Sequence, residues 1–251
     1  MAIPGTQRTV PVVRDRMKIP RAAAVAGIVF SLLLAATLVL LHLSVPPVSK
    51  VGDAWPAAGR SAVVLALSMA PFTGVAFLWF IGVIRERLGV SEDRFFATVF
   101  LGSGILFLAM FFAAAAVGGA VLVTWDREPR LLMESGGYVL GRAVAAQLMN
   151  VYAHKMAGVF MFSTATLIVR TRILPLWTAI LGFVLALLLM LTSHFYDWLG
   201  LAFPLWVFIL GLCILGDELR DLNTTQRQPA VGEASGEESV AANADGPARP
   251  R

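Results

Sequence analysis

The sequence has few of the residues that most known functional sites require. It contains one cysteine, Cys213, which excludes an intrachain disulfide and any metal or iron–sulfur site built on four thiolates of one chain. It carries no phosphate-binding loop, no dinucleotide fingerprint, no H-E-x-x-H zinc motif and no G-x-S-x-G elbow. These absences favour a non-enzymatic protein, with no cofactor expected.

Charge is also scarce. Charged residues make up 14% of the chain and hydrophobic residues 58%, whereas soluble domains have about 25% charged residues. The mean hydropathy of +0.77 means that the apolar surface exceeds what one soluble core of this size could hide. The net charge of +4 comes from short basic clusters between apolar runs, which form no continuous face for phosphates. We therefore expect the lipid bilayer as a partner and no nucleic acid.

Long apolar runs predict an all-α, polytopic bundle of about six transmembrane helices, since about 20 apolar residues cross a bilayer. The first run is too long for a cleaved signal peptide and has no A-x-A site after it, so we interpret it as a retained span. Residues 1–21 form a basic segment, residues 22–219 the membrane domain and residues 220–251 a tail. The predicted spans are 22–43, 61–84, 95–125, 150–169, 174–193 and 198–215.

Basic residues indicate the orientation of the spans. Most of the arginines near span ends lie in four segments. These segments precede the first span, connect the second to the third and the fourth to the fifth, and follow the sixth. We therefore expect a plasma-membrane protein, and the positive-inside rule places both of its termini in the cytoplasm. Residues 223–251 lack aromatic side chains and are rich in Ala, Gly, Glu and Pro, so we predict that the tail, residues 220–251, is disordered and cytoplasmic.

The fourth predicted span is the least apolar and carries a polar stripe, formed by Gln147, Asn150 and His154 at i, i+3 and i+7. Lys155 adjoins it. Polar groups in lipid face the bundle interior or water, so the stripe should face inward. Two interpretations remain open: hydrogen bonds between helices with Lys155 reaching toward the interface, or a ligand or ion pathway.

All three histidines fall in the outer half of the predicted topology. His42 ends the first span, His154 lies in the fourth, and His194 ends the fifth, three residues before Asp197. Three or four such groups converging could hold a metal ion, and two facing histidines could hold a haem. A membrane redox or metal-binding protein is therefore one alternative function.

Three segments resemble a broad set of bacterial multi-pass membrane proteins, particularly actinobacterial ones. They are the basic start that leads into residues 21–27, the entry to the fifth span at residues 172–177, and residues 203–207 near the end. The resemblance covers most of the membrane part. It implies a helical membrane protein and assigns no activity, cofactor or catalytic residue.

Three functions fit these observations. The first is a non-enzymatic membrane protein that binds a membrane-protein partner or forms a homo-oligomer. The second is a small transporter or channel, favoured by the polar stripe and by Pro71 and Pro204 inside predicted spans. The third is the redox or metal-binding protein that uses His42, His154, His194 and Asp197.

Overall fold

The computed structural model describes residues 19–45, 57–88, 94–172, 174–192 and 197–227, and its regular structure there is entirely helical. Among these residues, four helices are long and apolar enough to cross a membrane, as expected of a transmembrane protein. A further apolar helix, Leu176–Leu191, is shorter. The elements are α1 (Ile19–Ser44), α2 (Ala57–Leu88), α3 (Arg94–Arg127), α4 (Pro129–Glu134), α5 (Gly137–Gln147), the π-helix η3 (Leu148–Ala153), α6 (His154–Thr171), α7 (Leu176–Leu191), the 3-10 helix η4 (Asp197–Leu201) and α8 (Ala202–Arg227).

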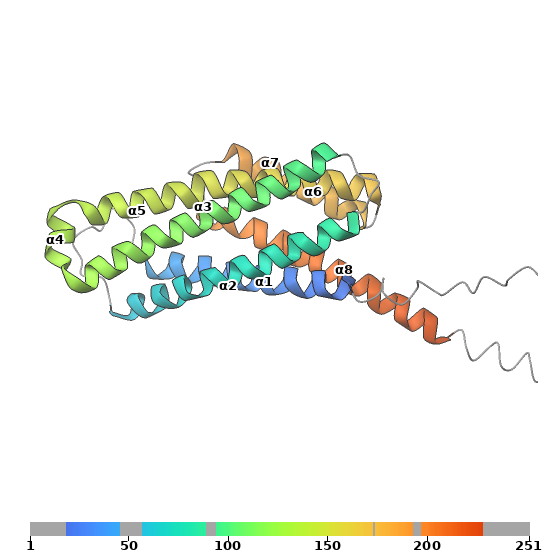
Figure 1. Ribbon diagram of the computed structural model, residues 1–251, viewed down its shortest axis with the longest axis horizontal. Coiled ribbons are helices and arrows are strands. Elements are labelled where there is room, and N and C mark those ends of the chain that lie inside the picture. The colour runs from blue at the N-terminus through green and yellow to red at the C-terminus, as the bar shows by residue number, and fades with distance from the viewer. Residues whose placement is uncertain (1–18, 46–56, 89–93, 173, 193–196, 228–251) are drawn as a thin grey trace, which may run out of the picture.

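Six of the described helices form a closed ring in which α1, α2, α3, α6, α7 and α8 each pack against the next, and α8 packs against α1. They lie roughly along one axis, with α4 at one end of the bundle (Figure 1). The start of α1 and the end of α8 lie together at the opposite end (Figure 1). We call these the α4 end and the termini end.

The outer surface of the ring is apolar. Trp79 and Phe72 of α2 are 68% and 69% exposed, and Ile180 of α7 is 63% exposed. Large apolar side chains that stand outward on several helices would be costly in water and favourable in lipid.

A phenylalanine cluster fills the middle of the ring. It consists of one residue each from α1, α2, α3, α6 and α8, all almost completely buried: Phe30, Phe77, Phe107, Phe160 and Phe203. The ring centroids of Phe30 and Phe77 are 4.5 Å apart, and those of Phe107 and Phe203 are 4.9 Å apart. These are favourable aromatic separations, so the cluster joins five helices at one level.

Most buried hydroxyl groups bond within their own helix. Ser31 Oγ donates to the Gly27 carbonyl at 2.7 Å, and Thr164 Oγ1 donates to the Phe160 carbonyl at 2.7 Å. An unpaired hydroxyl in an apolar interior would carry a desolvation penalty, which these bonds avoid. Between helices, Trp206 Nε1 donates to the Thr178 carbonyl at 3.1 Å and links α8 to α7.

The helices differ from the predicted spans in two places. Residues 126–149, expected to lie mostly outside the membrane as a connection, form α4 and α5, and α5 continues through η3 into α6. Alanine-rich sequence around Arg142 has high helix propensity even though its polar residues lower its hydropathy. The second difference is α8, which extends to Arg227, so residues 220–227 of the predicted disordered tail are helical.

No glycine or proline lies between Gly216 and Pro229, which explains why the helix continues beyond its apolar part. The rest of the predicted tail, residues 228–251, and most of the basic segment, residues 1–18, lie outside the described residues.

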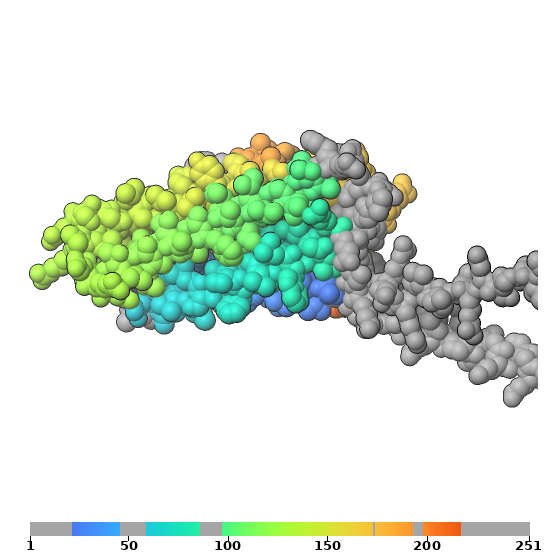
Figure 2. All heavy atoms as spheres, viewed as in Figure 1, coloured from blue at the N-terminus to red at the C-terminus, as the bar shows by residue number. Residues whose placement is uncertain are grey.

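At the α4 end, α2, α3, α4 and α5 project beyond the end of α1 (Figure 1). Figure 2 shows the tip of this part, formed by the green and yellow-green atoms at one end of the molecule. The 34 residues of α3 give it a length of about 51 Å, whereas the hydrocarbon core of a bilayer is about 30 Å thick. Two contacts hold the projecting part together. Arg60 of α2 donates from Nε and Nη2 to the two carboxylate oxygens of Asp126 of α3, at 2.8 and 2.6 Å. The Tyr138 side chain of α5 packs with Val121, Leu132 and Trp125.

Candidate ligand-binding cavity

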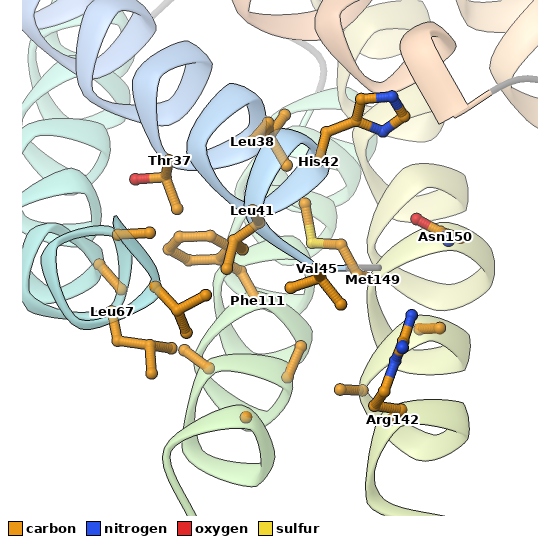
Figure 3. Close-up of a pocket in the computed structure, with 18 of the residues that line it drawn as sticks. Thr37, Leu38, Leu41, His42, Val45, Leu67, Phe111, Arg142, Met149 and Asn150 are labelled. Carbon is orange, nitrogen blue, oxygen red and sulfur yellow. The ribbon is translucent and has the colours of Figure 1, made fainter. Parts of the chain in front are cut away.

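A cavity of about 500 Å³ lies between the phenylalanine cluster and the α4 end. Its walls come from α1, α2, α3 and the α5–η3 segment, and Gly200 of η4 closes part of it. Figure 3 shows Leu38, Leu41 and His42 of α1 opposite Arg142 and Asn150 of the α5–η3 segment. The cavity is therefore built from residues far apart in the sequence.

Small side chains explain why the bundle is hollow here. Where the phenylalanine cluster has aromatic rings, α2 and α3 carry alanine or glycine on the same inner side toward the cavity, and α5 adds further small residues. These small lining residues are Ala66, Ala70, Ala114, Ala115, Gly118, Gly141, Ala145 and Ala146. Larger apolar side chains, including Leu38, Leu41, Leu67 and Phe111, also line the cavity.

The polar lining residues are Thr37, His42, Arg142, Asn150 and His154, and no aspartate or glutamate is among the described residues that line the cavity. Thr37 Oγ1 already donates to the Leu33 carbonyl at 2.8 Å. The described part of the wall is therefore apolar for most of its area and carries one permanent positive charge and no negative one.

Arg142 is half-buried on the cavity wall. Its Nη1 donates to the Tyr138 hydroxyl at 3.4 Å, and its guanidinium carbon lies 5.7 Å from the centre of the Tyr138 ring. Within the described residues Arg142 has no carboxylate partner, whereas Arg60 at the same end of the bundle has Asp126. A guanidinium has five N–H donors, so Tyr138 leaves most of them for another acceptor.

His154 follows a π-helical turn. In η3 the backbone takes up an extra residue, and His154 Nδ1 lies 2.6 Å from the Met149 carbonyl, five residues earlier. A carbonyl only accepts, so Nδ1 carries the proton, and Nε2 is left as an acceptor in the neutral ring. A methyl group at Gly200 would lie 2.6 Å from Nε2, so this glycine makes room for the imidazole.

The structure separates the residues of the predicted polar stripe. Asn150 and His154 line the cavity, but Gln147 is exposed and does not. The extra residue of η3 turns the earlier part of the helix by about 100° relative to an unbroken α-helix, which removes Gln147 from the shared face.

Lys155 lies away from the cavity. Its Nζ donates to the Met190 carbonyl at the end of α7, where a helix carries its partial negative charge. This position agrees with a structural role for Lys155 in holding α6 against α7.

The predicted metal ligands are only partly described. His42 and His154 both line the cavity, and the His42 ring packs against Trp198 with centroids 4.5 Å apart. His194 and the Asp197 side chain lie outside the described residues. Among the residues that the structure describes, no three His, Cys, Asp or Glu side chains are placed to hold a metal ion.

Sequence reasoning did not find Arg142 or Tyr138 as site residues. Both lie in the segment that was expected to connect two spans outside the membrane. A lone arginine in an alanine-rich helix-forming stretch was the available signal, because a charge at such a position needs water or a partner.

Comparisons with known proteins add no identification: no family model, no curated protein and no solved structure matches this chain. The resemblance to actinobacterial membrane proteins stays a prediction.

Proposed function

We propose that this chain is a six-span plasma-membrane protein with both termini in the cytoplasm, and that it binds a small amphipathic molecule in a cavity open to the outside. The arginine bias supports the cytoplasmic placement of the termini. The alternating direction of the six helical segments, whose first and last ends meet at the termini end, supports placing both termini on the same side. The short α6 and α7 are the fourth and fifth spans. Their ring contacts with α3 and α8 support their membrane position.

The cavity is the observation that carries the proposal. Ligand sites in proteins commonly have volumes of about 300–1,000 Å³, mostly apolar walls and a few polar groups. This cavity, at about 500 Å³ with its polar groups mainly on η3, α5 and the end of α1, has these properties.

Binding fits the wall better than catalysis does. Among the described lining residues there is no serine, cysteine or carboxylate nucleophile, and the Thr37 hydroxyl is engaged by its own helix. Asn150, His42, His154 and Arg142 offer hydrogen bonds and charge, which are the means of recognising a polar head group.

Cysteine labelling tests both the orientation and the open cavity. In a Cys213→Ser background, Ala145→Cys would place the single thiol on the cavity wall, and a charged, membrane-impermeant methanethiosulfonate reagent would be added to intact cells. We expect rapid labelling of Ala145→Cys. Ile180→Cys, on the lipid-facing side of α7, should stay unlabelled, and Thr171→Cys at the termini end should react only after permeabilisation.

Labelling of Ala145→Cys only in permeabilised cells would show that the orientation is reversed. Absence of labelling in both conditions, from protein that is present in the membrane, would show that the cavity is closed to water, and the proposal would then be wrong.

A carrier is the second candidate, favoured by irregular helices on two sides of the cavity. Pro71 of α2 has no N–H to offer the Leu67 carbonyl, and Leu67 lines the cavity; η3 supplies the opposite wall. In proteoliposomes, a carrier should move a fluorescent lysophospholipid across the bilayer. Asn150→Ala should reduce this movement more than Gln147→Ala does, since only Asn150 lines the cavity. Equal rates for the unmodified protein and protein-free vesicles would exclude this activity, and equal rates in the two variants would exclude a role for Asn150.

A further inference from the structure

The shape and charge of the cavity specify the ligand further, given the binding function proposed above. We infer that the cavity takes a single-chain amphiphile with an anionic head group, with the head at Arg142 and the chain directed toward the phenylalanine cluster.

The cavity is elongated along the bundle. Its lining on α3 extends from Phe111 to Val121, which at 1.5 Å per residue corresponds to about 15 Å. Its volume of about 500 Å³ equals about 17 water-sized groups at roughly 30 Å³ each. A long and narrow space of this size fits one extended chain better than a compact or two-chain molecule.

The two ends of the cavity differ in chemistry. Arg142 and Gly141 line the part nearer the α4 end, and Phe111 and Leu38 line the part nearer the phenylalanine cluster. A molecule that is charged at one end and apolar along its length matches this order. The reverse placement would leave its charge near Phe111, Ala70 and Leu38. The polar lining residues closest to that end, Thr37 and His154, carry no permanent positive charge, so an anionic head would lack a cationic partner there.

The negative charge that we expect on the head group of the ligand follows from Arg142. Its guanidinium is always protonated and presents a planar fork of donors that matches carboxylate and phosphate oxygens. Tyr138 holds it through the hydroxyl and the ring face and uses few of its donors. With no acidic residue among the described lining residues, a cationic head would meet only like charge or neutral groups.

Photo-crosslinking of the full chain in phosphatidylcholine nanodiscs tests this inference. The probe is a sixteen-carbon fatty acid with a diazirine at mid-chain, and peptide mapping locates the adducts. We expect adducts on the α2 and α3 stretches that contain Leu67 and Phe111. Palmitate and lysophosphatidate should compete at least about tenfold better than hexadecylamine or hexadecanol, and the better of the two acids identifies the preferred head group.

Arg142→Gln should lower cavity labelling about tenfold, because the charge-assisted bonds to the head group are lost. Arg142→Lys keeps the charge and should retain more labelling, which distinguishes loss of charge from misfolding. Arg130→Gln, which removes an exposed arginine of α4 outside the cavity, is the matched control and should label like the unmodified protein.

Equal competition by the amine or the alcohol would overturn the inference, as would unchanged labelling of Arg142→Gln. Either result is distinguishable from failure of the cavity itself, which the labelling of Ala145→Cys reports without any ligand.

Discussion

The same helices form a dense region and a hollow region within a few turns of each other. On α3, Phe107 lies in the phenylalanine cluster, and two to three turns toward the α4 end Ala115 and Gly118 line the cavity. On α2, Phe77 is followed in the same direction by Ala70 and Ala66. The contrast in side-chain size, at similar backbone arrangement, creates the cavity.

The contrast indicates how the two regions divide their roles. Helices in lipid gain little from burying apolar surface against each other, so their association depends on packing contacts and hydrogen bonds. The phenylalanine cluster supplies those contacts for five helices. We expect the cavity region to depend on the cluster on one side and on the α3–α4–α5 contacts on the other.

The largest loss of stability is expected in the dense region, at the phenylalanine cluster. Phe77→Ala removes a fully buried ring that contacts Phe30, Phe107, Phe160 and Phe203, and should lower the free energy of unfolding by about 3–5 kcal/mol. Phe72→Ala, five residues away on the exposed side of α2, should cost much less. Denaturant titration in mixed micelles measures both, and similar losses would contradict the assignment of the cluster as the core.

A smaller loss of stability is expected where α7 approaches Trp206 of α8. A methyl group at Gly182 of α7 would lie 2.8 Å from Trp206 Cζ2, so Gly182→Ala should destabilise by about 1–3 kcal/mol through overpacking. Gly102→Ala has open space and should be neutral, or more stable by up to about 1 kcal/mol, since alanine favours helix. The same denaturant titration measures the unfolding free energies of both variants. Equal values for Gly182→Ala and Gly102→Ala would show that α7 and α8 pack less closely than described.

Filling the hollow region should cost little stability. Ala115→Leu adds side-chain volume inside an existing cavity, so we expect unfolding free energy at or above that of the unmodified protein and slower reagent labelling of Ala145→Cys. Ala116→Leu adds the same volume on the exposed side of α3 and should leave the labelling rate unchanged. A strong destabilisation by Ala115→Leu alone would mean that this region is already filled.

The smallest effect is expected at the ion pair of the projecting part. Arg60 and Asp126 are 49% and 36% exposed, and exposed ion pairs contribute little because solvent and salt screen them. Arg60→Gln should therefore lower the free energy of unfolding less than Phe77→Ala or Gly182→Ala does. A double-mutant cycle with Asp126→Asn at low and high salt measures the coupling, which should weaken as salt increases.

Hydropathy alone predicted much of the fold. The first three spans and the last coincide closely with the four long apolar helices, because lipid requires about 20 consecutive apolar residues. The segment around Arg142 could not be placed in this way. Its helix propensity comes from alanine, whereas the hydropathy pattern registers its polar residues.

The candidate site was harder to predict for two reasons. The cavity depends on which small residues of different helices meet, and one sequence does not contain that information. The π-turn also changes the helical phase, so a face drawn with a regular period groups Gln147 with His154 although only His154 lines the cavity. Asn150 and His154 of the predicted stripe do line the cavity, because polar residues in an apolar helix tend to face inward, and their role in binding stays a prediction.

The π-turn has a consequence for how this protein tolerates changes in length. Deleting Val151, which does not line the cavity, would restore a regular α-helix and turn α5 by about 100° relative to α6. Arg142 would then leave the cavity wall while every side chain of the site remained in the sequence. The spacing of residues in this turn is therefore as much a part of the site as their identities, and a length polymorphism here would be more disruptive than most substitutions.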